Sequence, residues 1–134
     1  YETPYEEFGQ VTYEIWRATR LIVDTGIHHY GWSRDQALAT MKENVPLSEH
    51  EITTEVDRYI AWPAQALAYK LGEMQIRRHR REAEQALGAK FDQRKFHDVI
   101  LALGPVPLPV LEERMAKFIA DGGENPTPPA GAAP

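Results

Sequence analysis

The chain has 134 residues, a formal net charge of −5 and no cysteine. This length suits one domain with a modest core, and the lack of cysteine excludes disulfides, thiolate zinc sites and cysteine nucleophiles. The negative charge argues against broad nucleic-acid binding, which needs a basic face. No apolar run approaches the ~18 residues of a membrane span, and the first residues lack the basic and apolar regions of a signal peptide.

Helix start and stop signals follow one another along the chain. Starts are marked by capping residues and first-turn prolines, at Thr3 with Pro4, Ser33, Ser48, Asp92 and Pro109. The stops that lie between them are Gly31, Pro46, Gly88, Gly104 and Gly122. We therefore predict helices at roughly 4–30, 34–44, 49–87, 93–103 and 109–120, with Pro63 kinking or breaking the third.

Apolar periodicity supports these helices. Residues at steps of three and four form one apolar face in the first helix, at Phe8, Val11, Ile15, Ala18 and Ile22. Similar faces occur in the last two helices, at Phe96, Val99, Ile100 and Leu103, and at Leu111, Met115, Phe118 and Ile119. No segment alternates long enough to predict a strand. The predicted fold is an all-α bundle of about five helices over residues 1–121, followed by a flexible Pro/Gly/Ala-rich tail at 122–134.

A polar stripe runs along the first helix beside its apolar face. Arg17, Arg20, Asp24 and His28 are separated by three, four and four residues. Asp24 can therefore reach both Arg20 and His28, and its carboxylate would fix the tautomer of His28. In an otherwise apolar segment, such a ladder is either a buried structural network or one wall of a cleft. Gly26, inside the same helix, predicts the close approach of another backbone.

The stretch "DRYIAWPAQALAYK", residues 57–70, carries a second polar stripe. Arg58, Trp62, Gln65 and Tyr69 share one helical face, and Tyr59 lies next to it. Tyrosine hydroxyls beside an arginine can bind a carboxylate or a developing oxyanion. The alternative is that both tyrosines are structural, with hydroxyls satisfied inside the protein.

The sequence shows no complete catalytic apparatus of a familiar kind. None of the five histidines lies four residues from another, so there is no His-Glu-x-x-His element, and no metal ligands are predicted within this chain. Phosphate-binding glycine loops and a Gly-x-Ser-x-Gly elbow are also missing.

Three separated segments nevertheless resemble a known family in the right order: "WRATRLIVDTGIHHYGWSRDQAL", "EVDRYIAWPAQALAYKLGE" and "FDQRKFHDVILALGPVPLPVLEERM". Together they are similar to the C-terminal part of the bacterial domain-of-unknown-function 885 family, over about residues 5–119. Members are mostly much longer, are helical and resemble gluzincin-type zinc peptidases. Their His-Glu-x-x-His-like and Glu-Gly-Trp motifs lie upstream of the matched region. The resemblance thus implies a cleaved product or a fragment, expected to form the last quarter of a larger, mostly helical metallopeptidase-like fold.

The resemblance also implies roles for the two stripes. Tyr59 would donate to the oxyanion and His28, oriented by Asp24 and Arg20, would be a second donor. Arg58 would orient Tyr59 or bind a carboxylate of the substrate, and Gln65 and Tyr69 would line the cleft as further substrate-binding residues. The implied cofactor is zinc, held upstream, and the implied partners are a peptide-like substrate and the upstream part of the same polypeptide or a companion chain. The family points to the bacterial cell envelope or periplasm. The alternative function is a non-catalytic helical interaction or structural module.

Overall fold

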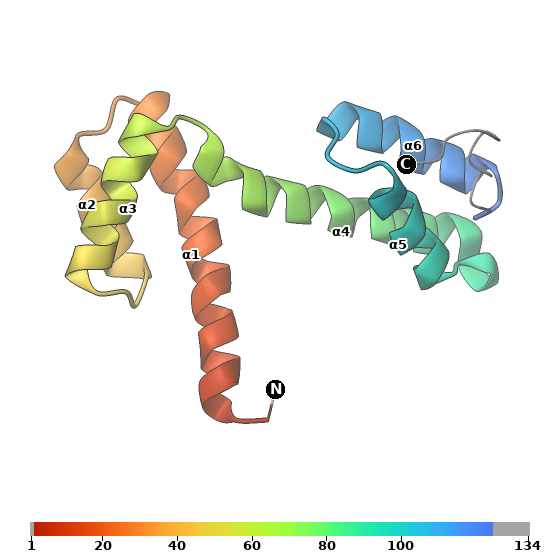
Figure 1. Cartoon of the computed structure of the whole chain (residues 1–134), viewed down its shortest axis with the longest axis horizontal. Helices are drawn as coiled ribbons and strands as arrows, with labels where there is room; N and C mark the ends of the chain where they lie inside the picture. The colour runs from red at the N-terminus through yellow and green to blue at the C-terminus, as the bar shows by residue number, and fades with distance from the viewer. Residues whose placement is uncertain (1, 125–134) are drawn as a thin grey trace. The chain divides into compact units, whose positions relative to one another are not determined.

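The computed structural model describes residues 2–124, and every regular element in that range is a helix (Figure 1). The all-α prediction is therefore confirmed. The predicted tail, 122–134, lies mostly outside the described residues. The elements in chain order are α1 (Pro4–His28), α2 (Arg34–Asn44), α3 (Glu49–Ala61), the 3₁₀ turn η1 (Gln65–Leu67), α4 (Ala68–Leu87), the 3₁₀ turn η2 (Gly88–Lys90), α5 (Gln93–Ala102) and α6 (Leu108–Ala120).

The predicted caps begin the helices. Thr3, Ser33 and Ser48 each accept a hydrogen bond from the backbone three residues on, and the Glu or Gln at that position bonds back to the cap. The Oδ1 atom of Asp92 accepts from the backbone N–H of Arg94 at 2.7 Å, which caps α5. These contacts use backbone donors that a helix start otherwise leaves without a partner.

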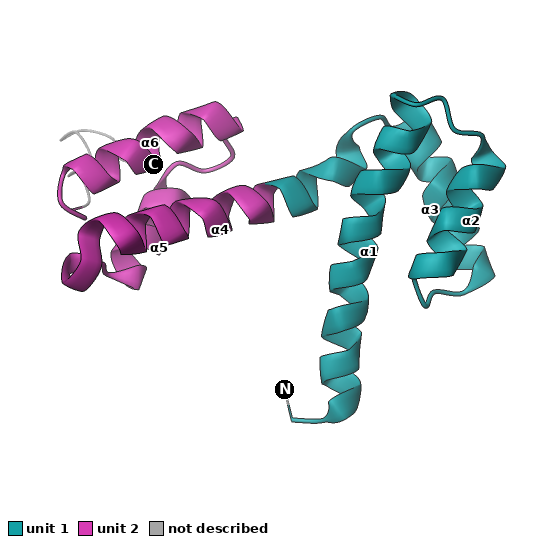
Figure 2. Cartoon of the chain, turned by 180° about the vertical axis from the view of Figure 1, so that it is seen from behind, with its two compact units in different colours: residues 1–71 teal, residues 72–134 magenta. Residues whose placement is uncertain are grey.

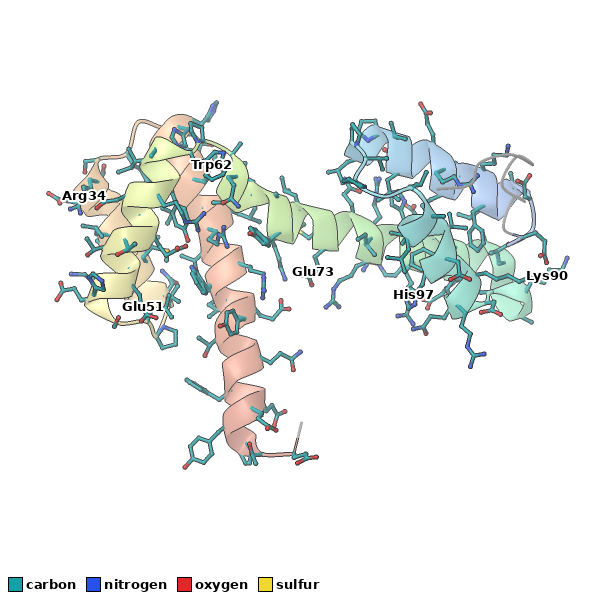
Figure 3. The ribbon with its side chains drawn as sticks, viewed as in Figure 1. Arg34, Glu51, Trp62, Glu73, Lys90 and His97 are labelled. Atoms are coloured by element: carbon teal, nitrogen blue, oxygen red, sulfur yellow. The ribbon has the colours of Figure 1, made fainter. Side chains whose placement is uncertain are left out.

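The third predicted helix is divided at Pro63 into α3, η1 and α4. Proline lacks a backbone N–H and disfavours helical geometry at the residue before it, and α3 accordingly ends at Ala61. Ala64 follows with a φ of 68°, a left-handed conformation that a residue with a Cβ adopts at a cost. Figure 3 labels Trp62, which lies between the end of α3 and this turn. The break redirects the chain, so residues 58 and 69 do not lie along one continuous helix.

The chain divides into two compact units, residues 1–71 and 72–134, with the boundary inside α4 (Figure 2). We expected one helical domain over residues 1–121, and each unit has a core of its own. In the first unit, α1, α2 and α3 bury Val23, Ala37, Met41, Val45, Ile52, Val56, Tyr59 and Ala66. In the second, α4, α5 and α6 bury Ala83, Phe96, Val99, Leu111, Met115 and Phe118.

The apolar faces predicted for the last two helices are buried or half-buried, whereas four of the five residues of the face predicted for α1 are exposed and only Ala18 is half-buried. Phe8, Val11 and Ile22 are 62%, 59% and 54% exposed. The face that α1 packs against α2, α3 and η1 carries a different set, with Thr19, Arg20, Val23, Asp24 and Gly26 buried. Periodicity thus found an apolar stripe on α1 that nothing in the described part of the first unit covers.

Gly26 is in close contact with a side chain, and not with another backbone as predicted. A Cβ built at Gly26 would lie 2.3 Å from an atom of the Trp32 ring. The backbone N–H of Trp32 also donates to the carbonyl of Gly26 at 2.9 Å, which fixes the turn after α1. The indole therefore occupies the space that any larger residue would need.

We predict that Gly26→Ala lowers the free energy of unfolding by about 1–2 kcal/mol, because the methyl group forces the Trp32 ring to move. Gly9→Ala is the matched control in the same helix, where a Cβ meets nothing within 4 Å. That variant should gain about 0.5–1 kcal/mol from helix propensity alone. Urea unfolding of both variants checks the pair, and equal shifts would contradict the contact.

Candidate functional site

Five of the seven predicted site residues gather in the first unit, where α1, α3, η1 and the start of α4 meet: Arg20, Arg58, Tyr59, Gln65 and Tyr69. Their contacts also include two residues that the sequence analysis missed, Trp16 and Glu55. Trp16 lies four residues before Arg20, and Glu55 lies four residues before Tyr59. This i, i+4 spacing, which places side chains on one helix face, was the available signal.

Gln65 joins the two predicted arginines. Its Oε1 atom accepts from Nη1 of Arg58 at 2.7 Å and from Nη2 of Arg20 at 3.3 Å. Its Nε2 atom donates to the hydroxyl of Tyr69 at 3.3 Å. Because Gln65 lies in η1, directly after the break at Pro63, the turn brings α1, α3 and the start of α4 to one amide side chain.

The hydroxyl of Tyr59 is fully engaged inside the protein. Tyr59 is 1% exposed, its hydroxyl donates to Oε2 of Glu55 at 2.7 Å, and it accepts from Nε1 of Trp16 at 3.1 Å. Burial and the hydrogen bond to Glu55 raise the pKa of Tyr59 above its ordinary value. These contacts hold a neutral phenol between α1 and α3.

Tyr69 is in the opposite situation. It is 48% exposed, and the guanidinium carbon of Arg20 lies 4.4 Å from the centre of its ring. The hydrogen bond from Gln65 and the positive charge of Arg20 lower the pKa of Tyr69 below its ordinary value. Tyr69 is thus a half-exposed phenol whose ionised form the surroundings stabilise.

Glu55 organises the α3 side of the cluster. Nε and Nη2 of Arg58 donate to its two carboxylate oxygens at 3.2 and 2.6 Å. Burial raises the pKa of Glu55, but the hydrogen bonds from Arg58 and Tyr59 outweigh it, so the pKa lies below the ordinary value. All three guanidinium nitrogens of Arg58 therefore donate within the protein, because Nη1 donates to Gln65.

Arg20 is a buried cation without a direct ion pair among the described residues. It is 6% exposed and lies over three aromatic rings, those of Trp16, Tyr59 and Tyr69. Within the described range, 2–124, its Nε atom has no hydrogen-bond partner. A buried guanidinium usually requires a carboxylate partner. In its place, Arg20 contacts the faces of three aromatic rings and the side-chain oxygen of Gln65.

Asp24 and His28 bind backbone groups of the neighbouring segment. The carboxylate of Asp24 accepts from the backbone N–H of Ala64 at 3.1 and 3.3 Å. Nε2 of His28 lies 2.8 Å from the carbonyl oxygen of Tyr59, and because a carbonyl only accepts, that nitrogen carries the proton. The expected contacts of Asp24 with Arg20 and His28 are not among the interactions of residues 2–124. His28, although exposed, is held at the end of α3.

Between residues 2 and 124, no three His, Asp or Glu side chains come together in a way that could hold a metal ion. Over the same residues, no helix is both long and apolar enough to span a bilayer. What the cluster offers chemically is one accessible phenol, supported by two guanidinium groups and an amide.

We predict that the two tyrosines titrate on opposite sides of about pH 10, the ordinary pKa of tyrosine. The tyrosinate absorbance lost in Tyr69→Phe should have a midpoint below that value, and the absorbance lost in Tyr59→Phe a midpoint above it. Spectrophotometric titration of the wild type and both variants gives the two difference curves. A Tyr69 midpoint at or above the ordinary value would contradict the described contacts with Gln65 and Arg20.

Comparison with known proteins places this chain in a family. No curated protein matches the chain. One solved structure, described as "the putative lipoprotein from Colwellia psychrerythraea", matches with a TM-score of 0.85 and 42% identity over 88% of this chain. The match covers 20% of that protein, so this chain spans about a fifth of its length. The family model for bacterial proteins of unknown function DUF885 matches residues 1–115, and the chain belongs to this family.

Proposed function

We propose that this chain is the C-terminal segment of a zinc-dependent peptide hydrolase and supplies one wall of its substrate cleft. The observation that carries the proposal is the accessible hydroxyl of Tyr69, with its lowered pKa and its place between Arg20 and Gln65. Such a phenol can donate a hydrogen bond to a peptide carbonyl as negative charge develops on its oxygen. The family resemblance supplies the reaction class.

Zinc does not fit the residues of this chain alone, because no suitable set of ligands gathers within residues 2–124. The proposal therefore places the metal ligands in the upstream part of a longer polypeptide or in a companion chain. The match covers 20% of the solved relative, which leaves room in a protein of that length for such a part.

The contacts favour Tyr69 over Tyr59 as the donor to substrate. A developing oxyanion needs a donor that can reach it, and the hydroxyl of Tyr59 is buried and already donates to Glu55. We assign Tyr59 a positioning role, in which it holds Glu55 and thereby the fork of Arg58. Arg58, whose side chain is 34% exposed, and Gln65 would contact the peptide beside Tyr69.

His28 and Asp24 position the wall in this proposal. His28 donates to the carbonyl of Tyr59 and Asp24 accepts from the N–H of Ala64, so the two side chains anchor both sides of the break at Pro63. The exposure of His28 leaves its other ring nitrogen a further candidate for contact with substrate. The name of the solved relative, a lipoprotein, supports a location at the bacterial cell envelope for this chain too.

The second candidate function is a non-catalytic helical module that binds a partner or stabilises a larger protein. The closed contacts of Tyr59 and Glu55 favour it, because a buried hydrogen-bond network can hold helices together without any chemistry. The two functions differ in what they expect when the hydroxyl of Tyr69 is removed. An exposed hydroxyl contributes little to a purely structural network.

We predict that Tyr69→Phe in the complete protein lowers kcat for peptide hydrolysis by about 10²–10³, the usual cost of removing one oxyanion donor. KM should change little, because the lost hydrogen bond matters most in the transition state. Steady-state kinetics with a panel of peptides measures both constants.

Tyr30→Phe is the matched control for this loss, since Tyr30 is 69% exposed and lies outside the cluster. Unchanged turnover in Tyr69→Phe would show that this hydroxyl has no catalytic role. If Tyr59→Phe then lowered kcat with KM and the unfolding temperature unchanged, Tyr59 would be the donor, whereas a raised KM would match its positioning role through Glu55 and Arg58. Absence of hydrolysis and of bound zinc in the complete protein would favour the structural module.

A further inference from the structure

The apolar stripe of α1 is the largest feature of the first unit that the proposed cleft does not use. Its five residues are separated by three, four, three and four positions: Phe8, Val11, Ile15, Ala18 and Ile22. This alternation is the a and d pattern of a heptad repeat, and it continues through two heptads and the first position of a third. The four larger members are between 40% and 62% exposed.

The stripe is separate from the face with which α1 builds the core. At about 100° per residue, the stripe lies about a third of a turn around α1 from Trp16, Val23 and Ile27, which pack in the core of the first unit. Ile22 is 54% exposed although it lies in the part of α1 that carries the buried residues, Thr19 to Gly26. The N-terminal half of α1 extends past both of those helices within this unit (Figure 1).

A contiguous row of exposed Phe, Val and Ile side chains is costly in water and marks an interface in soluble proteins. The heptad spacing specifies the kind of partner, because an a and d seam packs best against a second helix with a similar seam. Glu7 and Glu14 flank the stripe. Glu14 pairs with Lys70, while Glu7 has no ion pair within residues 2–124. The matching helix is therefore expected to carry a basic residue beside its apolar seam.

We propose that this stripe is the docking surface for an amphipathic helix from the remainder of a longer polypeptide that contains this chain. The inference rests on the part of the proposed function that places the chain in such a polypeptide, and it does not depend on hydrolysis. The solved relative argues for this occupant over a second copy, since about four fifths of its chain lies outside the matched region. That remainder is the nearest source of a helix, held at high effective concentration by the chain itself.

Cysteine labelling tests the docking directly, because the described chain has no cysteine of its own. We would introduce Val11→Cys on the stripe and, as a matched control, Gln10→Cys on the adjacent exposed position of the same helix. Both variants are made in the complete protein. Maleimide labelling rates are measured under native conditions and divided by the rate of the same variant in denaturant, with labelling of the parent protein subtracted.

We expect the Val11→Cys variant to label at least about tenfold more slowly than the Gln10→Cys variant, because labelling then requires the docked helix to open. The complete protein should remain monomeric in light scattering. Equal normalised rates would overturn the proposal, and so would an intact mass no larger than that of this chain. Protection that disappears when a dimer is diluted would also overturn it, because a second copy would then be the occupant.

Failure of this inference and failure of the proposed function give different results. The labelling experiment uses neither substrate nor zinc, so protection at Val11→Cys stands even if Tyr69→Phe leaves turnover unchanged. Conversely, a lost kcat in Tyr69→Phe together with an unprotected stripe would support the cleft and reject the docked helix.

Discussion

The break at Pro63 is the constraint on which the first unit depends. The proline ends α3, the chain turns through a left-handed residue at Ala64, and Asp24 of α1 accepts the backbone N–H that the turn exposes. A charge-assisted hydrogen bond of this kind is stronger than a neutral one, and it offsets part of the strain of a positive φ at an alanine. His28 secures the other side of the break at the carbonyl of Tyr59. Without this turn, Gln65 would not meet Arg20 and Arg58 together.

The polar cluster built on this turn separates two chemically similar tyrosines. The hydroxyl of Tyr59 accepts from the indole of Trp16 and donates to the carboxylate of Glu55, and the residue is buried. Tyr69 has a cation on its ring and an amide at its hydroxyl, and it faces water. Burial and neighbouring charge therefore move their pKa values in opposite directions. Pairs of titratable groups driven apart in this way are typical of functional sites, although structural networks produce them too.

Much of the fold could be predicted because its signals are local. The capping boxes at Thr3, Ser33 and Ser48 require only the residues within one turn, and the helices begin there. The contacts of Asp24 could not be predicted in the same way. Spacing along α1 favoured Arg20 and His28, but the turn after Pro63 offered a backbone donor 40 residues away. The position of Gly26 inside a helix likewise predicted a close contact. It did not show that the neighbour is the Trp32 ring.

The stripe on α1 shows a different limit, because periodicity reveals an apolar face but not what covers it. Phe8, Val11 and Ile22 belong to the predicted apolar face of the first helix, and they are exposed in the first unit. The central claim is that this chain completes a larger zinc-dependent protein, and intact mass analysis with metal quantification of the native material tests it most directly. The account predicts these residues within a substantially longer polypeptide, or a tight companion complex, that contains bound zinc. A stable, metal-free protein consisting of this chain alone would contradict it.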